Sequence, residues 1–175
     1  FQAAGKPVIA AGDFYTQAHY LLASQADHIL LHPEGGMFLE GFSVYRSYLK
    51  TFLEKIRVTM HVFRAGESKS AVEPYLRDDM SETERRIVTQ WLGGLWSTYT
   101  QHAEAGRDLP EGEMDRFIAD FGGRLKASNN DLAETILAGG WVDVLADHSE
   151  MEDALAEWVG VTDEEGHAEM IGLGR

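Results

Sequence analysis

The start of the chain contains short apolar segments that are separated by polar and turn-forming residues. Val8 to Ala11 form an apolar run between a Gly-Lys-Pro turn and Gly12-Asp13, which is typical of a buried strand in a parallel sheet. Thr16 is a good helix-capping residue, and the apolar spacing that follows it predicts a helix to about Ala26.

A second apolar run, Ile29 to Leu31, predicts the next strand, which we expect to end at Pro33 and Gly35-Gly36. A strand, a helix and a strand at this short spacing indicate a βαβ unit with a right-handed crossover. Met37 to Gly41 is then expected to be a short extended piece, and Tyr45 to Lys55 has the one-sided apolar spacing of a helix.

The middle of the chain combines a predicted strand, a loop and a long helix. Val58 to Phe63 alternates and is rich in β-branched and aromatic residues, so it predicts a strand. Glu73-Pro74 is expected to stop any helix, because proline disfavours helical geometry in the residue before it. Ser81 and Glu84 have the spacing of a capping box, which predicts a helix from Ser81 to about Ala105.

The last part of the chain is predicted to be mainly helical. The expected elements are a helix from Glu111 to Asp120 that ends at Gly122-Gly123, a short extended segment at 124–126, a helix capped within 128–131 that runs to Ala138, and a last helix capped by Ser149 and Glu152 that runs to about Val159. From Val161 onward, glycines and acidic residues indicate a loose tail or linker.

Composition narrows the class of protein. A chain of 175 residues can bury a sizeable core, and 44% hydrophobic with 25% charged residues is ordinary for a globular domain. Fifteen basic and 29 acidic residues give a net charge of −14, which argues against nucleic acid or an anionic membrane surface as a partner. The chain contains no cysteine, no visible signal peptide and no apolar run of membrane-spanning length. Because it begins at Phe1, we expect it to be a piece of a longer protein.

Few residues suggest chemistry by spacing alone. Lys69 follows Gly66 and lies among the small residues Ser68, Ser70 and Ala71, which leave room for another group to approach its amine. On spacing alone, a solvated loop lysine remains the favoured interpretation. Asp78-Asp79 lacks a third metal ligand at a recognisable spacing, the seven histidines lack zinc-site spacing, and no glycine-rich phosphate loop is present. We expect neither a metal nor a cofactor.

The segment F-R-A-G-E-S-K-S-A-V-E-P-Y-L-R-D-D-M-S, which contains Lys69, resembles the block around the catalytic lysine in the signal peptide peptidase A (protease IV) family, in its long two-repeat form. The resemblance continues through G-K-P-V-I-A-A-G-D-F-Y and W-V-D-V-L-A-D and covers about residues 4–160. It implies peptidase family S49 and an α/β fold of the ClpP/crotonase type, a repeat of short parallel strands crossed by helices. Residues 1–160 would form a partial N-terminal repeat that lacks its first strands, and 161–175 a tail or linker.

The resemblance also implies a catalytic arrangement. In that family a serine nucleophile and a lysine general base cut peptides, and Lys69 matches the lysine. Ser70 is expected to orient the amine. In the second repeat the nucleophile lies about five residues after a strand-ending glycine, but here that offset holds Gln17, and a one-residue shift to Thr16 would turn the side chain by about 100°. The nucleophile is therefore expected outside this chain, and Thr16 is expected to be only a helix cap.

The implied function is hydrolysis of cleaved signal peptides at the periplasmic face of the bacterial inner membrane, with an anchor outside this chain. The expected partners are peptide substrates, the second repeat of the same protein and further copies in a homo-oligomer, since aromatic residues such as Trp91, Trp96 and Trp141 suggest exposed apolar surfaces. Two alternatives stay open: a catalytically silent assembly or binding domain of the same fold, and a crotonase-like acyl-CoA enzyme. The second alternative needs a thioester-binding oxyanion hole, for which the sequence contains no motif.

Overall fold

The computed structural model describes residues 5–62 and 70–159, which fall into two compact units. The sheet unit comprises Phe1–Glu40 and Thr98–Arg175, and the inserted unit comprises Gly41–Ser97. Helix α4 (Glu82–Gly106) contributes residues to both units. The predicted boundary near residue 160 lies at the edge of the described residues and stays a prediction.

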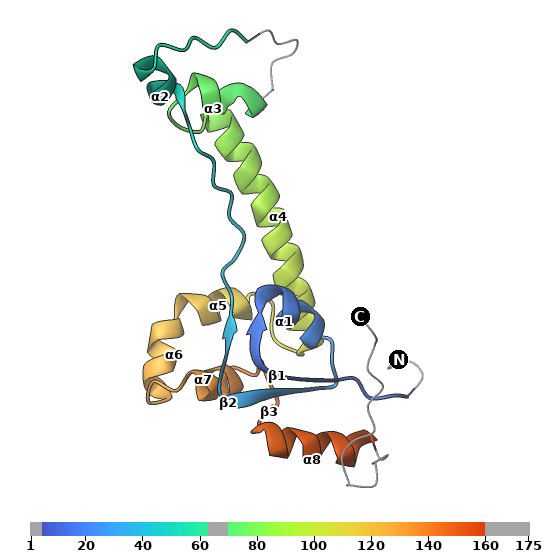
Figure 1. The fold of residues 1–175 in the computed structure, drawn as a ribbon. Helices are drawn as coiled ribbons and strands as arrows, with labels where there is room; N and C mark the ends of the chain where they lie inside the picture. The colour runs from blue at the N-terminus through green and yellow to red at the C-terminus, as the bar shows by residue number, and fades with distance from the viewer. Residues whose placement is uncertain (1–4, 63–69, 160–175) are drawn as a thin grey trace. The chain divides into compact units, whose positions relative to one another are not determined.

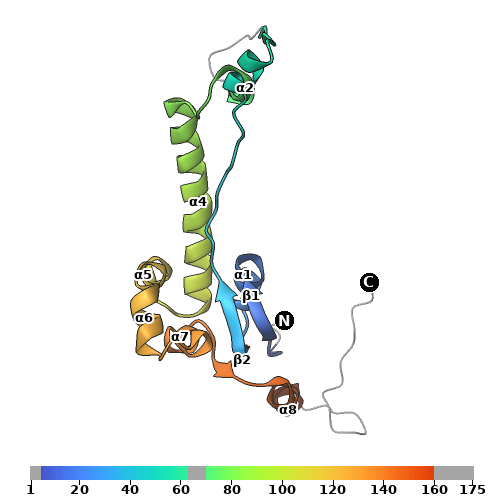
Figure 2. The ribbon, with the colours of Figure 1, turned by 60° about the vertical axis from the view of Figure 1, so that its left-hand side comes forward.

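Among its described residues, the sheet unit contains three parallel strands in the order β1-β2-β3 (Figure 1). Strand β1 (Ile9–Thr16) and strand β2 (His28–Phe38) are joined by helix α1 (Gln17–Ala23), which confirms the predicted βαβ unit. Strand β3 (Val144–Leu145) pairs only with Leu30 and Leu31 of β2. In Figures 1 and 2, α1 lies on the β1 side of this sheet, and helices α5 to α7 lie on the β2 side.

Both long strands continue past the residues at which we expected them to end. β1 runs through Gly12-Asp13, and β2 runs through Pro33 and Gly35-Gly36, with an irregular register between Gly12 and Phe14. A Cβ atom at Gly35 would lie 2.0 Å from the carbonyl oxygen of Asp13, so only glycine allows the two backbones to approach this closely. The glycines therefore permit the strands to continue rather than end them.

Up to residue 159, where the described part of the chain ends, four helices follow α4: α5 (Glu113–Ala119), α6 (Phe121–Ala127), α7 (Leu132–Ala138) and α8 (His148–Val159). The Asp131 side chain caps α7 by accepting from the N–H of Glu134, within the predicted capping segment. The predicted stop at Gly122-Gly123 and the extended segment at 124–126 are wrong, because α6 runs through both. The cap of α8 is also different: Asp147 and Glu150, rather than Ser149 and Glu152, exchange the two hydrogen bonds of a capping box.

The core of the sheet unit surrounds β2. Ile29, Leu30 and Leu31 are fully buried, and α8 covers part of this strand through Met151. Trp141, which we expected at a surface, is also fully buried: its ring contacts Tyr20 and Phe117 edge-on, and the Tyr20 hydroxyl donates to its carbonyl oxygen at 2.7 Å. The tryptophan therefore stabilises this unit instead of forming an interface.

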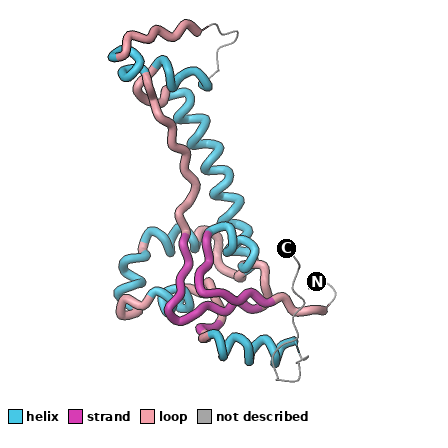
Figure 3. The backbone as a smooth tube through the Cα atoms, viewed as in Figure 1, coloured by secondary structure: helices cyan, strands magenta, loops and turns pink. Residues whose placement is uncertain are grey.

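The inserted unit contains α2 (Lys50–Lys55), the 3₁₀ turn η2 (Ser70–Val72), α3 (Glu73–Leu76) and the first part of α4, and Figure 3 draws its described residues as helices and loops only. The helix expected from Tyr45 begins only at Lys50, and residues 58–62 belong to no strand. Pro74 lies in the first turn of α3, where its missing N–H costs no hydrogen bond, so it begins a helix instead of stopping one. Every fully buried apolar side chain of the described residues belongs to the sheet unit.

Candidate functional site

The residues that follow the predicted catalytic lysine form a well-anchored segment of the inserted unit. Lys69 itself lies outside the described residues, so its role stays a prediction, and Ser70 begins η2. From Ser70 the chain passes through η2 and α3 and reaches Ser81 at the start of α4. The contacts of this segment hold in place the described residues that follow Lys69 in the sequence.

Glu73 and Ser81 form the first anchor. The Ser81 hydroxyl donates to one carboxylate oxygen of Glu73 at 2.6 Å, and the Ser81 N–H donates to the other at 3.2 Å. These hydrogen bonds favour the ionised carboxylate, so the side-chain hydrogen bond from Ser81 is the main reason that the pKa of Glu73 lies below its usual value. The Ser81 hydroxyl also accepts from the N–H of Glu84, which confirms Ser81 as the cap of α4.

Glu84 does not complete the predicted capping box. Its carboxylate pairs with Arg46 at 3.2 Å, and Glu73 takes its place as acceptor of the Ser81 N–H. The start of α4 is therefore held by a residue eight positions earlier in the chain, which connects this helix directly to the segment after the lysine.

A second anchor joins the same segment to α2. The Leu49 N–H donates to the Pro74 carbonyl oxygen at 2.6 Å, and the Thr51 N–H donates to Asp78 at 2.9 Å. Hydrogen bonds from Thr51 hold the pKa of Asp78 below its usual value. Asp79 pairs with Arg77 at 2.9 Å, so both members of the Asp78-Asp79 pair have structural contacts. Within residues 5–62 and 70–159, no group of three or more histidine and acidic residues is arranged to hold a metal ion.

The junction between β1 and α1, at Thr16 and Gln17, contains the predicted cap. The Thr16 hydroxyl accepts from the N–H of His19 at 3.3 Å and begins α1, which confirms its structural role. Gln17 is the first residue of α1. Nearby, His148 contacts the Asp13 carboxylate at 2.9 Å, and the rings of His148 and His32 lie with their centres 5.0 Å apart. The sequence does not predict that these three residues meet, because they come from β1, β2 and α8.

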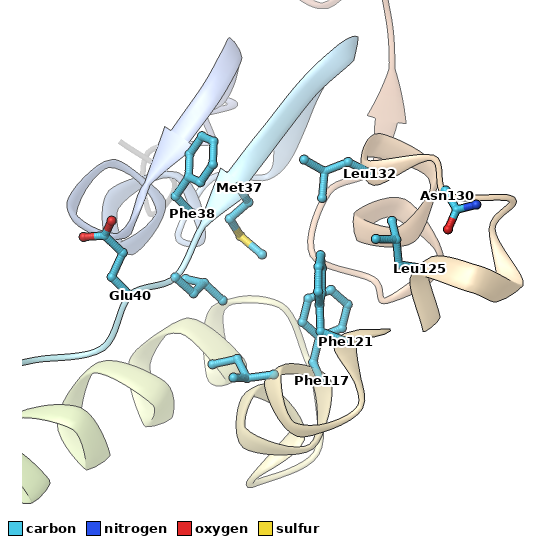
Figure 4. Close-up of a pocket in the computed structure, with 10 residues that line it drawn as sticks. Met37, Phe38, Glu40, Phe117, Phe121, Leu125, Asn130 and Leu132 are labelled. Atoms are coloured by element: carbon cyan, nitrogen blue, oxygen red, sulfur yellow. The ribbon is translucent and has the colours of Figure 1, made fainter. Parts of the chain in front are cut away.

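An apolar groove of about 480 Å³ lies beside the end of β2. Figure 4 shows it on the side of β2 away from β1, with Met37, Phe121 and Leu132 turned toward a common space. Its lining residues come from three segments: Met37, Phe38, Leu39 and Glu40; Phe117, Ile118, Phe121 and Leu125; Asn130 and Leu132. Sequence analysis missed this groove, because its walls lie up to 95 positions apart and share no periodicity; the one local signal was the apolar Met-Phe-Leu run after Gly36.

Comparison with known proteins places this fold in a family. The profile of peptidase family S49 matches residues 1–152 of the chain. The chain belongs to peptidase family S49. The expected α/β fold of the ClpP/crotonase type is therefore confirmed, both by this match and by the small parallel sheet with its helices.

Individual relatives of this S49 chain are peptidases by name. It is 39% identical over 160 residues to Protease 4 of Salmonella typhi, which covers 91% of the chain. It is 43% identical over 118 residues to Protease 4 of Haemophilus influenzae, and 23% identical over 118 residues to the chloroplastic serine protease SPPA of Arabidopsis thaliana, each covering 67% of the chain.

The S49 chain spans only part of these relatives: the aligned region is 26% of the Salmonella protein, 19% of the Haemophilus protein and 17% of the Arabidopsis protein. None of its described helices has the length and apolar character required to cross a bilayer.

Proposed function

We propose that this chain is part of a serine peptidase with a Ser/Lys dyad and that Lys69 is its general base. The observation that carries this proposal is the G-x-x-K-S-A-x-E-P motif around Lys69, inside the region matched to peptidase family S49. The similarity to two bacterial proteins named Protease 4 supports a peptide bond as the reacting group.

The proposed chemistry requires a neutral amine. A free lysine has a pKa of ~10.4, so at neutral pH only about one molecule in a thousand carries the unprotonated form. A site that excludes water disfavours the ammonium ion and lowers this pKa. The neutral Lys69 amine would take the proton of the serine hydroxyl as its oxygen attacks the peptide carbonyl, and would then pass that proton to the leaving amine. Ser70 is the candidate for orienting the amine.

The contacts of the segment that follows Lys69 in the sequence support this role. A carboxylate close to the amine would stabilise the ammonium ion and oppose catalysis. The Glu73 carboxylate already accepts two hydrogen bonds from Ser81, and these make it less available to pair with a lysine amine. The hydrogen bonds from Leu49 and Thr51 hold Pro74 and Asp78 in place, in the segment that follows Lys69 in the sequence, and a preorganised base requires a fixed surrounding of this kind.

The proposed substrates are cleaved signal peptides, and the proposed location is the periplasmic face of the bacterial inner membrane. The serine would come from the second repeat of the full-length protein, with homo-oligomerisation completing the assembly. Since Gln17 occupies the nucleophile offset, the 175-residue chain alone should have no peptidase activity.

The test compares Lys69→Ala and Lys69→Arg in the full-length protein, with a peptide ester and an acyl-CoA as alternative substrates. Both variants should lose turnover of the peptide ester while keeping the fold, because a guanidinium does not release its proton near neutral pH. Lys55→Arg, at an exposed position of α2, is the matched control and should keep full activity. Substantial activity of Lys69→Arg would show that the residue is only a positioning charge, and hydrolysis of the acyl-CoA alone would favour the crotonase-like alternative.

A further inference from the structure

We propose that helix α4 bends at Gly93-Gly94 and that this hinge moves the inserted unit, with the described residues that follow Lys69, relative to the sheet unit. The hinge itself rests on the geometry of α4. Its part in opening and closing the Ser/Lys dyad rests on the proposed peptidase function.

The first observation is where the two glycines lie. The chain passes between its two units at residues 40–41 and again at 97–98. Residues 39–49, around the first crossing, belong to no helix or strand. The second crossing lies inside α4, about one helical turn after Gly93 and Gly94. Among the described elements, only α4 continues through a crossing, so a bend in this helix changes how the units are connected.

The second observation is that packing requires neither glycine. A Cβ atom at Gly93 or Gly94 would meet no atom within 4 Å, whereas at Gly35 it would lie 2.0 Å from a backbone oxygen. Glycine in a helix interior is less favourable than alanine, because its backbone loses more conformational freedom. Glycine pairs are also among the common causes of helix kinks. The pair is therefore the point at which α4 bends most easily.

The third observation is that no packing supports the middle of α4. None of residues 85–98 is buried, whereas Glu84 in the first turn is buried, and buried side chains begin again at Tyr99. Most of the stability of a protein helix comes from packing of one face. Where that packing is missing, the intrinsic preference of the residues decides how stable the helix is, and here two of them are glycines.

The two ends of α4 are anchored to different segments. Just before its start, the Ser81 hydroxyl donates at 2.6 Å to Glu73, which lies four residues after Lys69 in the sequence. Near its other end, the Glu104 carboxylate accepts from the N–H of Met114 at 2.7 Å. A bend between these anchors moves the residues that follow Lys69 as one body. Hinge motions of this kind open and close many active sites and limit their turnover.

The experiment uses the full-length protein with Gly93→Ala and Gly94→Ala combined. The matched control is Gly122→Ala, because a Cβ at this position of α6 also meets no atom within 4 Å, but α6 lies wholly in the sheet unit. Spin labels are attached at Leu22→Cys, 77% exposed in the sheet unit, and Tyr45→Cys, 92% exposed in the inserted unit.

The 175 residues contain no cysteine of their own, and any cysteine elsewhere in the full-length protein is replaced by serine. Labelled protein is diluted into unlabelled protein, so that distances within one copy are measured. Electron paramagnetic resonance should give a broad distribution of label distances in the otherwise unchanged protein. The distribution should become narrower in the double-alanine variant and stay broad in Gly122→Ala.

Two further measurements follow the same variants. Hydrogen exchange at the amides of residues 95–98 should slow roughly ten- to thirty-fold in the double-alanine variant, the effect of replacing two helix-interior glycines. The kcat for a peptide ester should fall in this variant, because a stiffer helix opens and closes less often. Gly122→Ala should keep the exchange rates and the kcat of the unchanged protein.

A narrow distance distribution in the unchanged protein, or equal distributions in the double-alanine and Gly122→Ala variants, would overturn the hinge. A lower mass of the double-alanine variant in light scattering, with unchanged label distances, would also overturn it and show that the glycines contact another copy. Narrowed distances with unchanged kcat would refute the link to catalysis. If the unchanged protein has a broad distribution but no turnover, the proposed peptidase activity alone is refuted, because the label distances do not depend on it.

Discussion

Replacement of Glu104 by glutamine should destabilise the sheet unit, because this buried carboxylate caps a helix other than its own. Glu104 lies on α4 and is 3% exposed. Its two oxygens accept from the N–H of Gly112 at 2.9 Å and from the N–H of Met114 at 2.7 Å. Gly112 precedes α5 with a positive φ of 76° and offers no side-chain cap, so Glu104 supplies the missing acceptors.

The expected loss of unfolding free energy in Glu104→Gln follows from these contacts. A glutamine amide can accept from one of the two N–H groups but presents its own NH₂ to the other, which leaves a buried donor without an acceptor. A hydrogen bond to a charged group contributes ~1.5–3 kcal/mol, and the remaining bond becomes a weaker neutral one. We therefore expect a loss of about 2–4 kcal/mol, which for a chain of this size lowers Tm by roughly 5–15 °C.

The assay is thermal unfolding followed by circular dichroism, with hydrogen exchange at the Met114 amide as a local measurement. Glu111→Gln is the matched control, since this exposed residue lies in the same turn and should change stability by less than about 0.5 kcal/mol. Glu104→Gln should accelerate exchange at Met114, which is fully buried. Equal Tm values for the two variants, with unchanged exchange at Met114, would refute the capping role of Glu104.

Two further predictions concern the inserted unit. Ser81→Ala should raise the pKa of Glu73 toward its usual value of 4.5, as measured by NMR titration of the carboxyl carbon, whereas Ser47→Ala should leave it unchanged. Because the pKa of Glu73 is lowered in the folded state, its ionisation contributes stability that is complete above about pH 4.5 and is lost as the pH falls through the folded-state pKa. The difference in unfolding free energy between wild type and Ser81→Ala should therefore become smaller in acid. A difference that does not change with pH would contradict this account. The chain alone should self-associate through exposed side chains such as Trp91, Phe52 and Ile87. Light scattering should give an average mass that rises with protein concentration, and Trp91→Glu should lower that mass. A monodisperse monomer at high concentration would contradict this expectation.

Local sequence determined the elements whose signals are complete within a few residues. Thr16, Ser81 and Asp131 cap the helices that follow them, because a side-chain oxygen at that position satisfies N–H groups only two or three residues away. The apolar runs around Ala10 and Leu30 likewise predicted the two long strands and their parallel pairing. The motif around Lys69 pointed to the family, which the comparison confirmed.

At several glycines, contacts with other segments of the chain outweigh the local preference of the residue to end a strand or a helix. Gly35 looked like the end of a strand, but its lack of a side chain lets β2 continue past the carbonyl oxygen of Asp13. Gly122 and Gly123 looked like a helix stop, yet α6 runs through them, because packing of Phe121 against Phe117 and an ion pair from Arg124 to Glu113 hold this segment in place. Helix propensity is a weak preference, and tertiary contacts outweigh it.

Only the tertiary structure decided which apolar residues form a core and which form a surface. Trp141 and Trp91 look alike in the sequence, but the first is fully buried against Tyr20 and the second is 57% exposed. The groove beside β2 has the same origin, since it exists only because α5, α6 and α7 return to the edge that β3 leaves uncovered. A sequence specifies short-range hydrogen bonds directly, whereas burial depends on which distant segments meet, and that is determined by the fold as a whole.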